Sequence, residues 1–180
     1  VAHRALLCYK MEGIYPHLSG KPFKQPGRDA TLGSVARKQI ETFGRVLQDT
    51  HINKLVEMGF PLETWIIENE RILGARLTRE DTLGGRLNYN QLVALRPSDA
   101  ETFMLGVTAW ANVARNGKLQ LGVRYLPGAT EAVSIRATGV NLTVSDKYAP
   151  AFLLQAVPAL KVPASLIIPR DWFQQDRVVE

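Results

Sequence analysis

Apolar and polar residues alternate along most of the chain after residue 64, which is typical of half-buried β-strands. Turn-forming residues separate the alternating runs. Asn116-Gly117 is the strongest hairpin signal, and Pro97-Ser98-Asp99 marks another turn. The predicted strands cover residues 64–69, 74–79, 90–96, 103–113, 118–126 and 131–138. Six short strands joined by turns predict a mainly β fold closed into a barrel, because closure removes exposed strand edges.

The same alternation predicts the side chains that face the barrel interior. The predicted core residues are Trp65, Leu77, Leu92, Val107, Leu121 and Val123.

The N-terminal third does not continue this alternation of apolar and polar residues. Residues 4–11 form a short apolar run that fits a helix or a strand, and residues 16–29 are rich in Pro and Gly, as in a loop. A helix capped by Ser34 is predicted next, and Gly59 is its natural stop. Its apolar stripe comprises Ala36, Ile40, Phe43 and Leu47.

The C-terminal part carries two β-like runs, Ala151–Val157 and Ala164–Ile168, bordered by prolines, and then the apolar pair Trp172-Phe173. These patterns predict three parts: an N-terminal helical extension (1–59), a barrel (60–138) and a β-like C-terminal extension (139–180) that packs on the barrel.

Composition narrows the class of protein. The 180 residues are 46% hydrophobic and carry a net charge of +5, and no apolar run reaches 18 residues, so no membrane insertion is expected. The single cysteine, Cys8, cannot form an internal disulfide, which favours a cytoplasmic location.

Signals for catalysis and metal binding are missing from the sequence. His3, His17 and His51 lie far apart without neighbouring ligands, and Leu83-Gly84-Gly85 is too short for a phosphate loop. We therefore expect no catalytic residue, no metal and no cofactor, and the chain is not predicted to be an enzyme.

Arginines gather in residues 71–96, where five Arg face only Glu80 and Asp81. Arg71, Arg76 and Arg79 surround a predicted turn between Asn69 and Gly74, two residue types that tolerate positive φ. Guanidinium groups at a tight turn can form an anion site, but the spacing alone favours a solvated hairpin with ordinary surface arginines.

The segment from Trp65 to Leu77 resembles the turn of PilZ domains, whose signature is Asp/Asn-x-Ser-x-x-Gly. Asn69, Gly74 and Ala75 are in register with it, and the similarity extends over roughly residues 60–130, including 87–95, 105–110 and 116–126. The resemblance implies a six-stranded PilZ-like barrel related to cyclic di-GMP receptors. The candidate ligand-binding residues are Asn69, Arg71, Gly74, Ala75, Arg76 and Arg79.

The sequence departs from the PilZ signatures at two points, and both weaken the prediction that the chain binds cyclic di-GMP. Arg71 replaces the signature Ser, and residues 46–70 contain no Arg that could supply the family's Arg-x-x-x-Arg upstream of the first barrel strand. Weak or absent binding of cyclic di-GMP is therefore expected.

The leading prediction is a non-enzymatic bacterial regulatory or adaptor domain. It would act through contacts with another protein of a signalling or motility system, in pathways that control motility, pili or exopolysaccharide. The alternatives are a true cyclic di-GMP receptor with a non-standard site and a nucleic-acid-binding barrel. Nucleic acid is the weaker alternative because charge outside residues 71–96 is nearly balanced.

Overall fold

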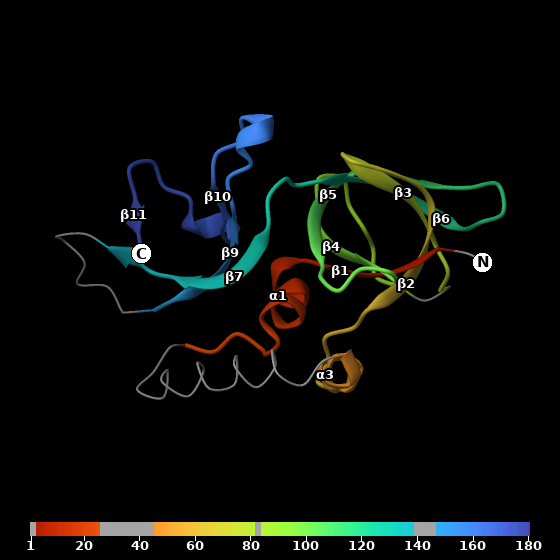
Figure 1. Ribbon diagram of the computed structural model, residues 1–180, viewed down its shortest axis with the longest axis horizontal. Helices are drawn as coiled ribbons and strands as arrows, with labels where there is room; N and C mark the ends of the chain where they lie inside the picture. Colours follow the sequence, from red (N-terminus) through yellow and green to blue (C-terminus); the bar gives the residue numbers. More distant parts are fainter. Residues whose placement is uncertain (1–2, 26–44, 82–83, 139–146) are drawn as a thin grey trace.

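A closed antiparallel barrel of six strands forms one half of the molecule (Figure 1). The computed structural model describes residues 3–25, 45–81, 84–138 and 147–180. In barrel order the strands are β1 (Arg4–Tyr9), β2 (Glu63–Arg71), β3 (Gly74–Arg79), β6 (Leu119–Tyr125), β5 (Met104–Val113) and β4 (Leu92–Pro97). Pairing of β1 with β4 closes the barrel, so the predicted fold class is confirmed.

One of the six predicted barrel strands was wrong. The apolar run near the N-terminus is β1, a strand that pairs with β2 and β4 on either side. The predicted strand 131–138 instead lies outside the barrel, in a separate sheet. The barrel therefore does not coincide with residues 60–138. Its first strand, β1, is separated from β2 by more than 50 residues, and the alternation of apolar and polar residues does not show that two such distant segments pair.

The barrel interior is filled by residues that alternate along the strands. Trp65, Leu77 and Leu121 are fully buried, and Val123 is buried as well, as predicted. Leu92 and Val107 are only half-buried and pair with each other across β4 and β5. The prediction was wrong for these two by one position, because β4 has apolar residues on both faces.

Replacing Leu121 with Ala should lower the free energy of unfolding by about 2–5 kcal/mol, because it opens a cavity in a filled barrel. Urea denaturation measures the loss. Val113→Ala, at an exposed position on the neighbouring strand, is the matched control and should change stability little. Equal effects of the two substitutions would mean that the interior face was assigned wrongly.

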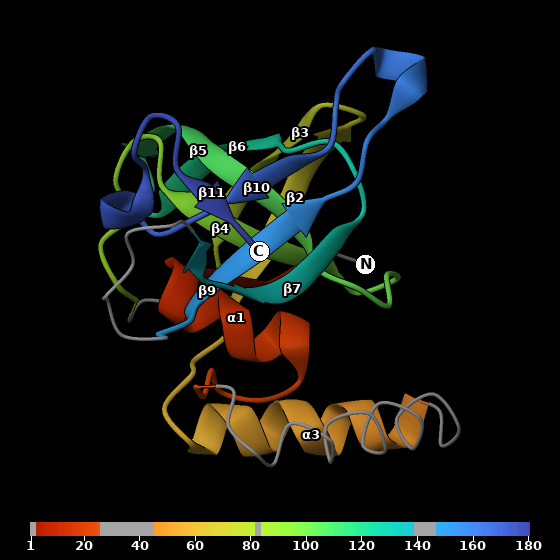
Figure 2. The same cartoon turned by 90° about the vertical axis from the view of Figure 1, so that its left-hand side faces the viewer.

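A second sheet lies beside the barrel, with a helix between them (Figures 1 and 2). The helix is α1 (Met11–Ser19). The sheet has the order β10 (Ser165–Ile167), β9 (Ala149–Leu154), β7 (Thr130–Ile135), and a two-stranded ladder joins β8 (Ala137–Thr138) to β11 (Val178–Val179). Two 3₁₀ turns, Pro158–Leu160 and Arg170–Trp172, complete the tail.

The space between barrel, α1 and second sheet is a continuous apolar core. Cys8 and Leu105 from the barrel, Ile14 from α1, and Phe152 and Leu154 from β9 belong to one buried cluster. The outer face of β1 and β4 is therefore covered by protein, which explains why those strands are apolar on both sides. Trp172 packs against a further small cluster, whereas Phe173 is exposed.

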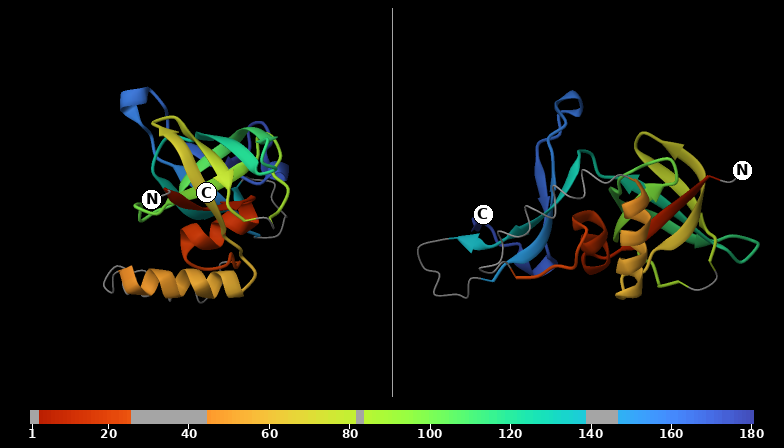
Figure 3. Two further views of the ribbon diagram at one scale, coloured as in Figure 1. Left: turned by 90° about the vertical axis from the view of Figure 1, so that its right-hand side faces the viewer. Right: turned by 60° about the horizontal axis from the view of Figure 1, so that its bottom comes forward.

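The helix α3 (Arg45–Glu57) runs below α1 and leads into β2 (Figure 3). Most of the predicted apolar stripe, Ala36, Ile40 and Phe43, lies outside the described residues, as does the side chain of Leu47. Leu55 is buried, and Gly59 follows the helix with a φ of 97°. Within the described ranges, no helix is both long and apolar enough to cross a membrane.

Candidate functional site

The β2–β3 hairpin carries the predicted site, but its turn is built differently from the prediction. Ile72 and Leu73 form the turn, while Asn69 lies within β2 opposite Arg76. Gly74 is the first residue of β3, and neither it nor Asn69 is among the described residues with positive φ. The expected role of these residues in supplying positive φ was therefore wrong.

Gly74 is required for another reason, the close approach of β6. A Cβ atom at this position would lie 2.1 Å from the backbone carbonyl oxygen of Val123. Only glycine lets the two backbones come so near. Because Gly74 has no side chain, the outer surface of the barrel is also hollowed at this point.

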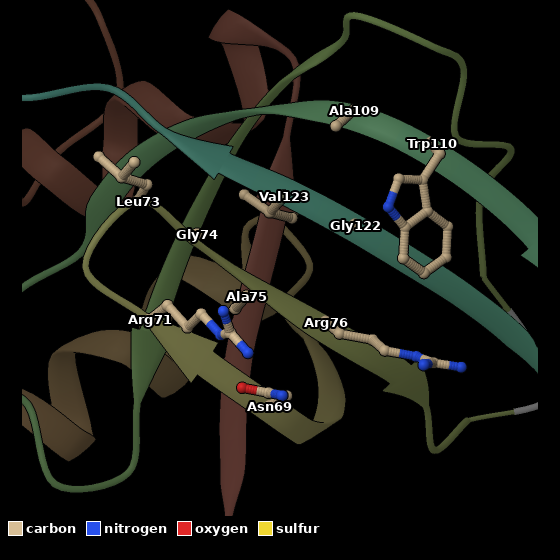
Figure 4. Close-up of a pocket in the computed structure, with 10 residues that line it drawn as sticks. All are labelled: Asn69, Arg71, Leu73, Gly74, Ala75, Arg76, Ala109, Trp110, Gly122 and Val123. Carbon is tan, nitrogen blue, oxygen red and sulfur yellow. The ribbon is translucent and has the colours of Figure 1, made fainter.

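A hollow of about 360 Å³ occupies this low surface (Figure 4). It is lined by Asn69, Arg71, Leu73, Gly74, Ala75, Arg76, Ala109, Trp110, Gly122 and Val123. Five of the six predicted site residues are thus brought together around this hollow.

Strand register explains why these residues share one face. Asn69 pairs with Arg76, Arg76 with Gly122, and Gly122 with Trp110, so the four form a cross-strand row over β2, β3, β6 and β5. Ala75 and Leu77 on β3 are buried, which places Arg76 between them on the outer surface.

Two irregularities in strand pairing flank the hollow. The register shifts on β2 between Ile67 and Asn69, and on β5 between Thr108 and Trp110. Bulges re-aim side chains and often lie next to binding sites. Here they bring Asn69 and Trp110 into line with the row on β3 and β6.

Trp110 forms one wall of the hollow. A Cβ atom at Gly122 would lie 2.1 Å from the indole Nε1, so the ring rests directly on the glycine. The Arg76 guanidinium lies 5.9 Å from the ring centroid and donates a hydrogen bond to Gln120 Oε1 at 3.3 Å. Trp110 remains 39% exposed, which leaves ring surface open for stacking.

Arg79, the sixth predicted residue, does not line this hollow. Its Nη2 lies 3.0 Å from Glu63 Oε1 and donates to the Gly85 carbonyl oxygen at 2.8 Å, and its guanidinium stacks over Trp65 at 5.0 Å. Burial raises the pKa of the Glu63 carboxyl, although Arg79 acts against this rise. Arg79 is therefore engaged in a nearly buried ion pair near the residue 84–85 loop.

A tyrosine and a glutamate meet near the β2–β3 turn. The Tyr125 hydroxyl donates to Glu70 Oε1 at 2.6 Å. Burial, together with this carboxylate, raises the pKa of Tyr125 well above its usual value. Tyr125 N–H also donates to the Leu73 carbonyl oxygen at 2.9 Å, so these contacts fix the turn against the end of β6.

Sequence reasoning missed Trp110 and Gly122, because nothing in the linear chain shows that β5 and β6 lie beside β3. The one sequence signal for this part of the site was Gly122 within an alternating run. An isolated glycine in a strand suggests that another group packs closely against its backbone. No group of three or more His, Cys, Asp or Glu suited to a metal ion occurs among the described residues.

Comparison with known proteins places the chain near a cyclic dinucleotide receptor. It is 26% identical over 121 residues to the cyclic-di-GMP receptor FimW of Pseudomonas aeruginosa (strain PAO1), an alignment that covers 67% of this chain and 20% of the receptor. The similarity confirms the predicted relation to the cyclic di-GMP receptor family. The chain thus aligns with about a fifth of the receptor's length.

A family model described as the FimW C-terminal beta-barrel domain matches residues 133–180. This segment holds β8 to β11 and the end of β7, so the match falls on the second sheet and not on the closed barrel. No solved structure shows significant similarity to the chain. Any stretch of 121 residues in a chain of 180 includes residues 60–121, so the alignment with FimW includes β2 to β5 of the barrel.

Proposed function

We propose that this chain is a bacterial regulatory domain that binds cyclic di-GMP in the hollow on the outer face of the barrel. The observation that supports it best is the grouping of Asn69, Arg71, Gly74 and Arg76 around one hollow beside an exposed tryptophan. The similarity to a cyclic-di-GMP receptor supports the choice of ligand.

The chemistry of the hollow suits the two parts of the ligand. Cyclic di-GMP carries two phosphates and two guanine rings. Arginine donates paired hydrogen bonds to phosphate oxygens or to the guanine edge, and the exposed Trp110 ring offers a stacking surface for a base. Gly74 and Gly122 present backbone without side chains, so a ligand can approach the strands closely.

One of the two arguments for weak binding, the missing Arg-x-x-x-Arg, rested on a strand order that differs from the observed one. The Arg-x-x-x-Arg of the family belongs upstream of the first barrel strand, which is β1 and not the strand at residue 64. Residues 46–70 therefore do not occupy the position where that motif would lie. Their lack of arginine is no argument against the ligand.

Titration with cyclic di-GMP, followed by calorimetry and by tryptophan fluorescence, tests the proposal. We expect saturable binding with a Kd of about 1 μM or tighter, equivalent to about −8 kcal/mol. Arg76→Ala should weaken binding at least about tenfold, because a charge-assisted hydrogen bond contributes roughly 1.5–3 kcal/mol.

Two controls define the outcome. Arg115→Ala removes an exposed arginine from the β5–β6 hairpin, away from the hollow, and should bind like the wild type. Trp110→Phe should abolish most of the fluorescence change, since Trp65 is buried inside the barrel. Absence of binding by the wild-type chain, with the fold intact, would refute the proposal.

An adaptor role through protein contacts is a second candidate, and one observation favours it. Ile72 and Leu73, at the tip of the β2–β3 hairpin, are 90% and 71% exposed. Two aliphatic side chains held in water at a turn suit a contact with another protein of a signalling system. In that case Ile72→Ser, at a residue that does not line the hollow, would abolish partner binding while leaving any dinucleotide affinity unchanged.

A further inference from the structure

A second cross-strand row crosses the same face of the barrel and contains two arginines. Arg71 on β2 pairs with Gly74 on β3, and Gly74 pairs with Arg124 on β6. We propose that Arg71 and Arg124, here called the arginine bracket, hold one phosphate group between them above Gly74. The inference rests on the proposed function, in which this group is a phosphodiester of the cyclic dinucleotide.

Register and spacing place both side chains within reach of one anion. Residues directly opposite on neighbouring strands share a face of the sheet, so both arginines project on the side of Gly74. Their backbones are two strand spacings apart, about 10 Å. The Cβ position of Gly74 lies only 3.3 Å from the Arg124 Cα, and Gly74 itself places no side chain between the two arginines.

The two arginines also lack carboxylate partners of the kind that Arg4 and Arg79 have. Arg4 binds Glu80 and Arg79 binds Glu63. Within the described ranges, neither Arg71 nor Arg124 has a recorded side-chain hydrogen bond or ion pair, and both are exposed. Like charges near one another raise the free energy of the fold unless an anion joins them.

The carboxylates nearest to Arg71 and Arg124 do not neutralise the positive charge of these two arginines. Glu70 pairs with the buried Ala75, which places it on the other side of β2 from Arg71, and it accepts the Tyr125 hydroxyl. Glu68 lies at the bulge of β2, further along the strand. Arg76 adds a third positive charge on the same face of the sheet, two residues after Gly74.

The arginine bracket differs from the PilZ signature in both members. Arg71 stands where the signature has Ser, and Arg124 lies on β6, outside both sequence motifs. The arginine bracket would explain why position 71 carries an arginine: its side chain pairs with Arg124, a residue that only the barrel fold brings close to it.

Calorimetric titration of the whole chain with cyclic di-GMP tests the arginine bracket. Arg124→Ala should weaken binding about 10- to 100-fold, and Arg71→Ala should do the same, because each loses a charge-assisted contact. Arg124→Lys should fall between wild type and Arg124→Ala, since lysine keeps the charge but not the paired donors. Arg115→Ala, also an exposed arginine, should bind as the wild type does.

The outcomes separate this inference from the proposed function. If the wild type and Arg115→Ala bind and Arg76→Ala is weakened, but Arg124→Ala binds normally, the arginine bracket is wrong while the proposed function stands. If the wild type does not bind cyclic di-GMP, inorganic pyrophosphate is titrated while the side-chain Nε–H signals of Arg71 and Arg124 are followed by NMR. Joint shifts of both signals would support the arginine bracket without the proposed function, and no shift would overturn it.

Discussion

Replacing Gly74 with Ala should lower the free energy of unfolding by more than about 4 kcal/mol, or prevent folding, in a domain whose total stability is expected to be about 5–15 kcal/mol. The new methyl group would lie 2.1 Å from the carbonyl oxygen of Val123, and that neighbour is backbone, which cannot rotate away. The β3–β6 ladder would have to open. Thermal and urea denaturation followed by circular dichroism measure the loss.

Gly13→Ala is the matched control for this substitution. Gly13 lies in α1, and a Cβ atom there would meet nothing within 4 Å. The control should raise stability by about 0.5–1 kcal/mol, because alanine is the better helix former. A Gly74→Ala variant as stable as the wild type would contradict the close approach of β3 and β6.

Replacing Phe152 with Ala should cost about 3–5 kcal/mol and should destabilise the barrel together with the second sheet. Phe152 is fully buried in the cluster that joins β9, α1 and the outer face of the barrel, and its ring lies 6.0 Å from that of Tyr15. Urea denaturation followed by two probes measures the effect: far-ultraviolet circular dichroism and the fluorescence of Trp65, recorded in a background that carries Trp110→Phe and Trp172→Phe.

Phe173→Ala provides the comparison for Phe152→Ala. Phe173 is 78% exposed, so its removal should change stability by less than about 0.5 kcal/mol. Coincident transitions of both probes in the Phe152→Ala variant would show one cooperative unit. Separate transitions, with the Trp65 signal unchanged, would instead support a tail that folds independently of the barrel.

Five of the six barrel strands could be predicted from the sequence, because each is a short run of strand-forming residues that ends near a recognisable turn. The strand β1 could not be assigned, since a short apolar run buried on both faces has no period-two pattern. Its apolar outer face is explained only by α1 and β9, which cover it. The half-buried state of Leu92 has the same origin.

The candidate site was predictable where it lies along one hairpin and not where it depends on neighbours across the barrel. Asn69, Arg71, Gly74 and Arg76 are close in the chain and remain close in space. Arg79 is equally close in the chain, but a partner on β2, Glu63, holds it elsewhere. Trp110 reaches the hollow, and Arg124 lies opposite Gly74, only through strand pairing, which sequence spacing does not encode.

The position of β1 in the barrel has a consequence for how fast the chain folds. This first strand pairs with β2 and β4, although residues 10–62 separate it from β2. Pairings between distant segments form slowly, because the entropy of closing the intervening loop must be overcome before the contacts stabilise it. During synthesis β1 is made before its partners β2 and β4, and the barrel can close only after β6 has also been made, because β6 joins β3 to β5 in the barrel order.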